Sequence, residues 1–336
     1  MAKMLFFIYN PHAGTQKIRV KLAEIVELFA DAGYRITVHP TQTRGEAFSV
    51  IEKLDAGYSL VVCSGGDGTL AEVAGGMLRR DRSERIPIGY IPSGSTNDFG
   101  MSLKIPNDML EAAKVPLTGR ELFCDMGRFN RRSFVYVAAF GMFTDISYET
   151  DSELKHTFGH LAYILEAILR FPQVKACHMT VDHDGVILED DFLFGMVSNS
   201  LSVGGIKSVT GPDVLLDDGL FEVTLVRSPQ NPQDLHNKAL ATIGGEESNS
   251  FIINFKTDRI RFCSDRPVPW TLDGEYGGKP KKAELMNLRG ALRIMVPMDV
   301  ELPCIDDKEE KTELQEGDRL ALEAEAYADL AERVGI

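Results

Sequence analysis

The chain has 336 residues and a net charge of −14, with 44% hydrophobic and 26% charged residues. That length suits two domains, and the composition is ordinary for a globular protein. The excess of acidic residues argues against nucleic-acid binding, which needs a basic surface. The five cysteines form no CxxC pair, so we expect neither a disulfide framework nor a zinc site, and the cytoplasm is the expected compartment.

The first 120 residues alternate between strand and helix patterns. The helix over 18–33 has apolar residues at helical spacing and ends at Gly33, a suitable C-cap. The predicted helices are 18–33, 45–57 and 70–80, and the predicted strands or strand-and-turn segments are 4–10, 34–40, 59–69 and 86–94. This alternation predicts a Rossmann-like parallel sheet with helices on its faces.

After residue 122 most segments are strand-like and are separated by short turns, which predicts a β-sandwich. His183-Asp184-Gly185 is a good hairpin signal. Only 161–171 and 233–243 have helical patterns, and an acidic tail from Asp306 ends in an Ala-rich helical pattern. That last pattern is typical of a docked or frayed surface helix, and a partner-binding helix is the alternative.

Three polar or glycine-rich turns follow predicted strands: 10–14 (NPHAG), 65–69 (GGDGT) and 92–98 (PSGSTND). Ligands of parallel sheets lie beyond the carboxyl ends of the strands, where these turns meet. Backbone N–H groups at a glycine loop and a helix N-terminus attract phosphate. Each turn alone could be an ordinary turn or a helix N-cap, but three at one sheet edge predict a nucleotide cleft. The spacing matches neither GxGxxG nor GxxxxGK[ST].

These three motifs, in this order, resemble the catalytic domain of the diacylglycerol kinase family in its compact bacterial form, a distant relative of NAD kinases and sphingosine kinases. Two later stretches, 215–221 (LLDDGLF) and 272–275 (LDGE), support the resemblance. It implies an α/β ATP-binding domain over 1–122, joined again by about 290–336. A β-rich sandwich domain over 123–289 would contribute metal and catalytic residues.

The resemblance also implies residue roles. Glu275 would be the general base, although DGE by itself is more typical of a hairpin turn. Asp67, Asp98 and Asp125 would form one acidic network near the triphosphate and its Mg²⁺. A second, structural Mg²⁺ would be held by Asp218 and the carbonyls of Leu215 and Leu220, where the alternative is a plain DDG turn. The expected nucleotide-binding residues are Asn10, Thr41, Gly65, Gly66, Asp67, Gly68, Thr69, Leu70, Ala71, Ser95 and Asn97.

The family often has a basic residue after the glycine of the first motif, and this chain has Thr15 there. Lys17 or Arg19 is the expected replacement for that charge. No segment approaches the roughly 20 apolar residues that span a bilayer, so we expect any membrane contact at the surface. The pattern over 160–175 suits an interfacial helix or an ordinary core-facing one, and the lysines over 279–282 suit either anionic headgroups or water.

The leading hypothesis is therefore an ATP- and Mg²⁺-dependent lipid kinase, peripheral at the inner membrane surface, that converts diacylglycerol to phosphatidic acid. The alternatives are an NAD kinase-like enzyme with a soluble substrate and a non-catalytic nucleotide sensor. A homodimer is plausible from the resemblance. The sequence leaves open which lipid is the acceptor.

Overall fold

The computed structural model describes residues 3–141, 176–200, 202–203, 206–207, 214–228 and 252–304. The two helices predicted over 161–171 and 233–243, the basic and apolar segment over 160–175, and the tail from residue 306 lie outside the described residues.

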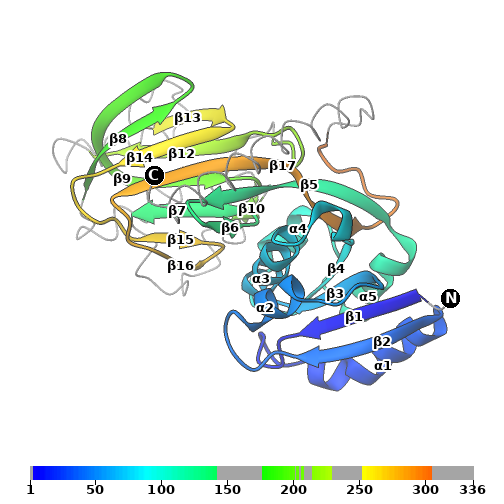
Figure 1. The fold of residues 1–336 in the computed structure, drawn as a ribbon. Coiled ribbons are helices and arrows are strands. Elements are labelled where there is room, and N and C mark those ends of the chain that lie inside the picture. The colour runs from blue at the N-terminus through cyan, green and yellow to red at the C-terminus, as the bar shows by residue number, and fades with distance from the viewer. Residues whose placement is uncertain are drawn as a thin grey trace.

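The first part of the chain is a parallel sheet with helices packed on it (Figure 1). Its four strands lie in the order β4-β3-β1-β2, and β1 and β3 are almost entirely buried, as expected for strands covered on both faces. Helix α1 packs against α5, and α2 packs against α3. The elements are β1 (Lys3–Tyr9), α1 (Ile18–Asp31), β2 (Tyr34–Pro40), α2 (Glu46–Glu52), β3 (Tyr58–Gly65), α3 (Asp67–Leu78), η1 (Arg82–Glu84), β4 (Ile88–Pro92), α4 (Asp98–Ser102) and α5 (Met109–Thr118).

The predicted elements of this part are present, and the largest changes of boundary are in α2 and α3. Helix α2 ends at Glu52, short of the predicted 45–57, because its buried face is limited to Ala47 and Ile51. Helix α3 begins at Asp67 instead of residue 70, so the glycine loop is itself the first turn of the helix.

The second part of the chain is built from antiparallel strands (Figure 1). Its core is rich in aromatic side chains, with Trp270 at 4.8 to 5.1 Å from the rings of Phe129, Phe140 and Phe262. The strands are β5 (Arg120–Phe129), β6 (Arg132–Phe134), β7 (Val137–Gly141), β8 (Cys177–His183), β9 (Val186–Ser198), β10 (Ser202–Val203), β11 (Ile206–Lys207), β12 (Phe221–Arg227), β13 (Ile252–Thr257), β14 (Arg259–Cys263), β15 (Trp270–Leu272), β16 (Glu275–Gly278) and β17 (Lys282–Val296).

The long strand β17 connects the two parts. It pairs with β14 at one end, and at the other Ile294 pairs in parallel with Ile88 of β4. Strand β5 runs antiparallel beside it, with a register shift between Leu288 and Leu292. One 15-stranded sheet therefore runs through the described residues of both parts. The predicted domain boundaries stay a prediction, because this sheet has no break at residue 122 or 290.

Both predicted DG turns of the β-rich part are hairpins. Asp184 and Gly185 have φ values of 49° and 78°, and Asp273 and Gly274 have 49° and 79°. Two successive positive φ angles are the signature of a type I′ turn, which matches the twist of the flanking strands. Glu275 follows this β15–β16 turn directly, so the hairpin turn and the predicted general base occupy the same motif.

Candidate active site

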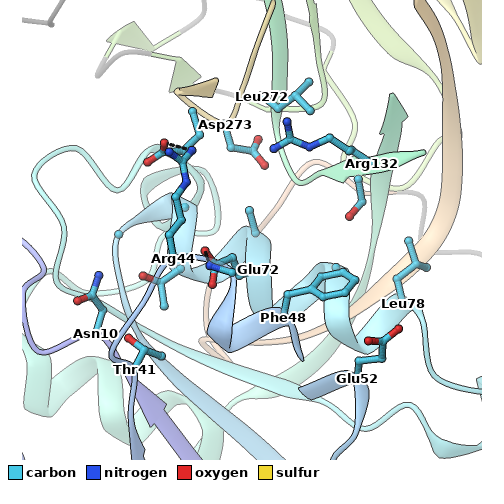
Figure 2. Close-up of a pocket in the computed structure, with 18 of the residues that line it drawn as sticks. Asn10, Thr41, Arg44, Phe48, Glu52, Glu72, Leu78, Arg132, Leu272 and Asp273 are labelled. Atoms are coloured by element: carbon cyan, nitrogen blue, oxygen red, sulfur yellow. Dashed lines mark hydrogen bonds and ion pairs between the residues drawn. The ribbon is translucent and has the colours of Figure 1, made fainter. Parts of the chain in front are cut away.

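A cavity of about 1760 Å³ lies between the two parts of the molecule (Figure 2). The three polar loops of the parallel sheet line one side, and the β15–β16 hairpin lines the other. The predicted residues on its wall are Asn10, Thr41, Gly66, Gly68, Thr69, Ala71, Ser95 and Glu275. Small-molecule pockets are typically about 300–1,000 Å³, so this volume has room for two ligands.

The loops interlock through glycines. A Cβ on Gly94 would overlap the Cα of Gly66, and a Cβ on Gly14 would overlap the carbonyl oxygen of Ser93. Gly14 also has a φ of 48°, in the region that favours glycine. At these positions glycine is required for loops to pack on each other, in addition to any approach of a phosphate.

Gly68 differs from these glycines. A Cβ at Gly68 would meet only the side chain of Glu275, at 3.5 Å, which is an ordinary contact. Gly68, in the first turn of α3, is therefore a direct neighbour of the Glu275 side chain. At a helix N-terminus the helix dipole and the unpaired N–H groups favour an anion. A phosphate bound to this turn would lie beside Glu275.

The polar residues at the ends of β1 and β2 are held by the sheet. The backbone N–H of Asn10 donates to the carbonyl oxygen of Ser64, and the N–H of Thr41 donates to that of Tyr9. The side-chain oxygen of Asn10 accepts from the N–H of His12 at 2.9 Å, which shapes the first loop. Arg19 donates to the carbonyl oxygen of Pro11 at 3.0 Å, so it braces this loop.

The remaining predicted nucleotide-binding residues have mixed positions. Leu70 is fully buried in the core, and a Cβ on Gly65 would overlap the side chain of Thr69. The backbone N–H of Leu70 donates to the carbonyl oxygen of Gly66 at 3.2 Å, so a direct ligand contact by Leu70 stays a prediction. The amide of Asn97 bonds to the N–H and carbonyl of Gly94 at 2.9 and 3.0 Å, which shapes the third loop.

Asp67 caps a neighbouring helix. Its carboxylate accepts from the N–H groups of Asp98 and Phe99 at 2.9 and 3.3 Å, at the start of α4. The alternative interpretation of the third turn was a helix N-cap, and here the side chain that caps the start of α4 is Asp67 of the second loop. Burial, together with the charge of Asp98, raises the pKa of Asp67 to about 7.

A smaller cavity of about 210 Å³ adjoins this region. It is lined by four carboxylates, those of Asp67, Asp98, Asp273 and Glu275, beside Gly68. This concentration of acidic groups suits a hard cation, which would reduce their mutual repulsion. Mg²⁺ in kinases typically takes one or two carboxylates and completes its shell with water and substrate phosphate. One or two of these carboxylates would fit that pattern, although in the described part of the chain no three such side chains converge on one point.

Asp273 anchors the hairpin that carries Glu275. Its buried carboxylate accepts from the N–H groups of three consecutive residues, Val135, Tyr136 and Val137, at 2.7 to 3.1 Å. Burial raises the pKa of Asp273 to about 6 even though these bonds favour its charged form. No role of Asp273 was predicted from the sequence, although it is part of the LDGE stretch.

Glu275 forms an ion pair with Arg44 across the cavity. Figure 2 shows Arg44 extending from the loop before α2 toward the hairpin that contains Asp273. The two residues are 231 positions apart in the chain, and no local pattern in the sequence marked Arg44.

Asp125 is fully buried and lines neither cavity. Its carboxylate accepts from the N–H groups of Gly219 and Gly290 at 2.6 and 2.7 Å, at the irregular point of the β5–β17 pairing. Burial raises its pKa to about 7, and the charges of Asp217 and Asp218 add to this. Its direct hydrogen bonds and nearest charges come from Gly290 and the 217–220 loop, and its membership of one network with Asp67 and Asp98 stays a prediction.

The residues at Asp218 do not fit a resident Mg²⁺. One carboxylate oxygen accepts from the N–H of Leu220 at 2.9 Å, and the other lies 3.5 Å from the ammonium of Lys256. Lys256 is also 3.3 Å from Glu222, so a cation already neutralises this pocket. In the described part of the chain, no three His, Cys, Asp or Glu side chains converge in a metal-binding geometry. Roles for Leu215, Asp218 and Leu220 as ligands stay a prediction.

Comparison with known proteins gives the context for this geometry. Residues 4–129 match the sequence model of the diacylglycerol kinase catalytic domain, and residues 139–296 match that of the YegS C-terminal NAD kinase beta sandwich-like domain. A diacylglycerol kinase of Staphylococcus carnosus is 32% identical over 89% of this chain and 97% of its own length. The diacylglycerol kinase of Staphylococcus aureus strain MRSA252 is 33% identical over 89% and 94%.

Solved structures agree on the fold. A crystal structure of a diacylglycerol kinase from Bacillus anthracis superposes with a TM-score of 0.66 at 24% identity, covering 88% of this chain and 97% of that one. A second structure from the same organism gives 0.72 at 25% identity over 88% and 95%. The predicted fold class, an α/β nucleotide-binding part followed by a β-sandwich, is confirmed.

The fold and its cavity thus define a two-part kinase. The parallel sheet with its glycine loop lines one side of the cavity, and the β-sandwich lines the other. The chain belongs to the diacylglycerol kinase family, and it is a lipid kinase. Among the described residues, no helix is long and apolar enough to cross a membrane.

Proposed function

We propose that this protein transfers the γ-phosphate of ATP to the hydroxyl of diacylglycerol and forms phosphatidic acid. The observation that carries this proposal is the position of Glu275, which lies against Gly68 at the start of α3. A general base must lie within reach of the acceptor hydroxyl, and that hydroxyl must lie beside the phosphate. The diacylglycerol kinases among the relatives support the choice of acceptor.

In the proposed reaction Glu275 accepts the hydroxyl proton while the acceptor oxygen bonds to the γ-phosphorus. The bond from that phosphorus to the bridging oxygen breaks, and ADP leaves with the electron pair. The start of α3 stabilises the phosphate charge through backbone N–H groups. Asp67 and Asp98 would hold Mg²⁺, whose charge neutralises the phosphates when it is bound. Asn10, Thr41 and Ser95 line the wall on which the nucleoside would lie.

The two predicted domains would have different roles in this reaction. Residues 1–122, joined again by about 290–336, would bind the nucleotide, and residues 123–289 would supply the base. The acceptor must come from a bilayer. Tyr276 of β16, next to Glu275, is 54% exposed. Lys279 and Lys281 in the connection from β16 to β17, and Lys282 at the start of β17, are also exposed. An aromatic and cationic surface of this kind suits contact with an anionic membrane.

The proposal is tested with purified protein, γ-labelled ATP and mixed micelles that contain one lipid each, with Mg²⁺ or with EDTA. The lipid panel contains diacylglycerol, monoacylglycerol, phosphatidylglycerol and a sphingoid base, with NAD as the soluble acceptor. Glu275→Gln is the inactive control, because an amide of the same shape accepts no proton at neutral pH.

We expect Mg²⁺-dependent label in phosphatidic acid and its loss in the control. Label in another lipid would support lipid kinase activity with that lipid, and not diacylglycerol, as the acceptor. Label in NAD would support the soluble-substrate alternative. Binding of ATP without any transfer would contradict catalysis and support a sensor.

A further inference from the structure

The ion pair between Arg44 and Glu275 joins the two parts of the molecule across the cavity. The Arg44 side chain is 65% exposed and that of Glu275 is 52% exposed. Exposed ion pairs contribute little to stability, since water solvates both partners when they separate. This pair is therefore easily broken by a ligand with a stronger charge.

The loop that carries Arg44 is fixed by backbone hydrogen bonds. One carboxylate oxygen of Glu46 accepts from the N–H groups of Gln42 and Thr43 at 2.6 and 3.0 Å. Glu72 of α3 accepts from the N–H groups of Gly45 and Ala47 at 2.7 and 3.2 Å. Since the backbone on both sides is held, only the side chain of Arg44 has freedom to move.

Three features converge at one point of the cavity. The first turn of the twelve-residue helix α3 offers N–H groups, Glu275 lies 3.5 Å from a Cβ position on Gly68, and Arg44 lies against Glu275. A phosphate on this turn would thus lie within reach of the Arg44 guanidinium. Arginine binds phosphate through a planar fork of N–H donors, and it does so more strongly than it binds one exposed carboxylate oxygen.

Three other arginines of the cavity have partners away from Glu275. Arg85 donates to the carbonyl oxygens of Arg80 and Leu78, and Arg132 donates to that of Tyr276. Arg79 lies 3.8 Å from Glu52. Arg44 is the arginine whose contact with Glu275 places it at the proposed point of phosphoryl transfer.

We infer that Arg44 exchanges partners during the reaction. In the nucleotide-free enzyme it pairs with Glu275, and on nucleotide binding it moves to the terminal phosphate. The exchange leaves the Glu275 carboxylate to accept the proton of the acceptor hydroxyl, and it places a positive charge on the phosphoryl group that is transferred. Arg44 is thus a phosphate-binding residue of the active site. The inference rests on the proposed function, because it takes ATP as the ligand.

The test measures nucleotide binding by calorimetry, without any lipid. The ligands are AMP-PNP, a non-hydrolysable ATP analogue, and AMP, which lacks the terminal phosphates. The proteins are wild type, Arg44→Ala, Glu275→Gln and the double variant. Arg79→Ala is the matched control, since Arg79 lines the same cavity and is 67% exposed. Thermal melting of each variant shows that it is folded.

We expect Arg44→Ala to weaken AMP-PNP binding about tenfold, the effect of one lost charge-assisted hydrogen bond, and to leave AMP binding unchanged. Glu275→Gln should tighten AMP-PNP binding, since it releases Arg44 from its partner. In the double variant that gain should disappear, so its affinity should equal that of Arg44→Ala. Arg44→Lys should restore part of the affinity.

Two results would overturn the exchange. One is equal AMP-PNP affinity for wild type and Arg44→Ala. The other is tightening by Glu275→Gln that persists when Arg44 is absent. If no folded variant, wild type included, binds AMP-PNP at all, the proposed use of ATP fails and the exchange fails with it. The two proposals are therefore separated by the wild-type measurement.

Discussion

The molecule has two separate groups of carboxylates, and they differ in their surroundings. The first group, Asp67, Asp98, Asp273 and Glu275, lines the small cavity beside the glycine loop. The second group, Asp125, Asp217, Asp218 and Glu222, lies inside the β-rich part around the 217–220 loop, where Lys256 pairs with two of its members.

Both groups contain acids whose pKa is raised by burial, yet the first group lines the cavity beside the glycine loop and the second lines neither of the two cavities described above. A raised pKa by itself is therefore a poor guide to catalysis here, because burial produces it in structural and functional positions alike. The comparison predicts that changes in the first group act on activity, whereas changes in the second act on stability.

The largest effect is expected from Glu275→Gln. Loss of a general base typically lowers kcat by about 10²–10⁴-fold. The side chain is 52% exposed, so the melting temperature should not change. Initial rates with saturating ATP and a melting curve check both parts. If the variant keeps its kcat, Glu275 is not the general base, and the prediction that changes in the first group act on activity fails.

Asp125→Asn tests the second group. The amide leaves one of the N–H groups of Gly219 and Gly290 facing an N–H₂ group, which costs about 1–3 kcal/mol of unfolding free energy. The melting temperature should then fall by about 1–4 °C, with the KM for ATP unchanged. Asp182→Asn is the matched control, since Asp182 is 42% exposed and pairs with Arg261. If Asp125→Asn raises the KM for ATP and melts like wild type, Asp125 acts on nucleotide binding, as the first group does.

The pH dependence of stability tests what the two groups share. Burial raises the pKa of Asp273 to about 6, those of Asp67 and Asp125 to about 7, and that of Glu222 to about 8. Above about pH 4 the folded protein still holds protons that the unfolded chain has released. The contribution of these four acids to the free energy of unfolding is therefore greatest below about pH 4, and it is lost as the pH rises through 6 to 8.

We therefore expect the melting temperature to fall between pH 5 and pH 8.5. Glu222→Gln, which cannot ionise, should flatten the upper end of the curve. Mg²⁺ should raise the melting temperature more at pH 8 than at pH 5 if it binds the ionised cavity acids. A curve that rises with pH across this range would contradict the assigned directions.

A small effect on stability is expected from Gly68→Ala. The added methyl makes only an ordinary contact with Glu275, and alanine is favoured over glycine in a helix by roughly 0.5–1 kcal/mol. The variant should thus melt at the same or a slightly higher temperature while binding AMP-PNP more weakly, because the methyl group occupies the phosphate position.

Gly94→Ala provides the contrast to that change. Its methyl group would overlap the backbone of Gly66, so both stability and nucleotide affinity should fall. If Gly68→Ala binds AMP-PNP as well as wild type, the phosphate lies elsewhere.

The sequence by itself determined the fold class, the three loops at one edge of the sheet and the DG hairpins. These depend on periods of 2 and 3.6 residues and on short turn signals, which are local properties. The motifs also identified Glu275 together with the glycine loop. Only the tertiary structure decided which side chains face each other: Arg44 with Glu275, Asp67 with the start of α4, and Asp125 with the 217–220 loop. Partners brought together from distant points of the chain leave no periodic trace, since their contact depends on how the two parts of the molecule pack.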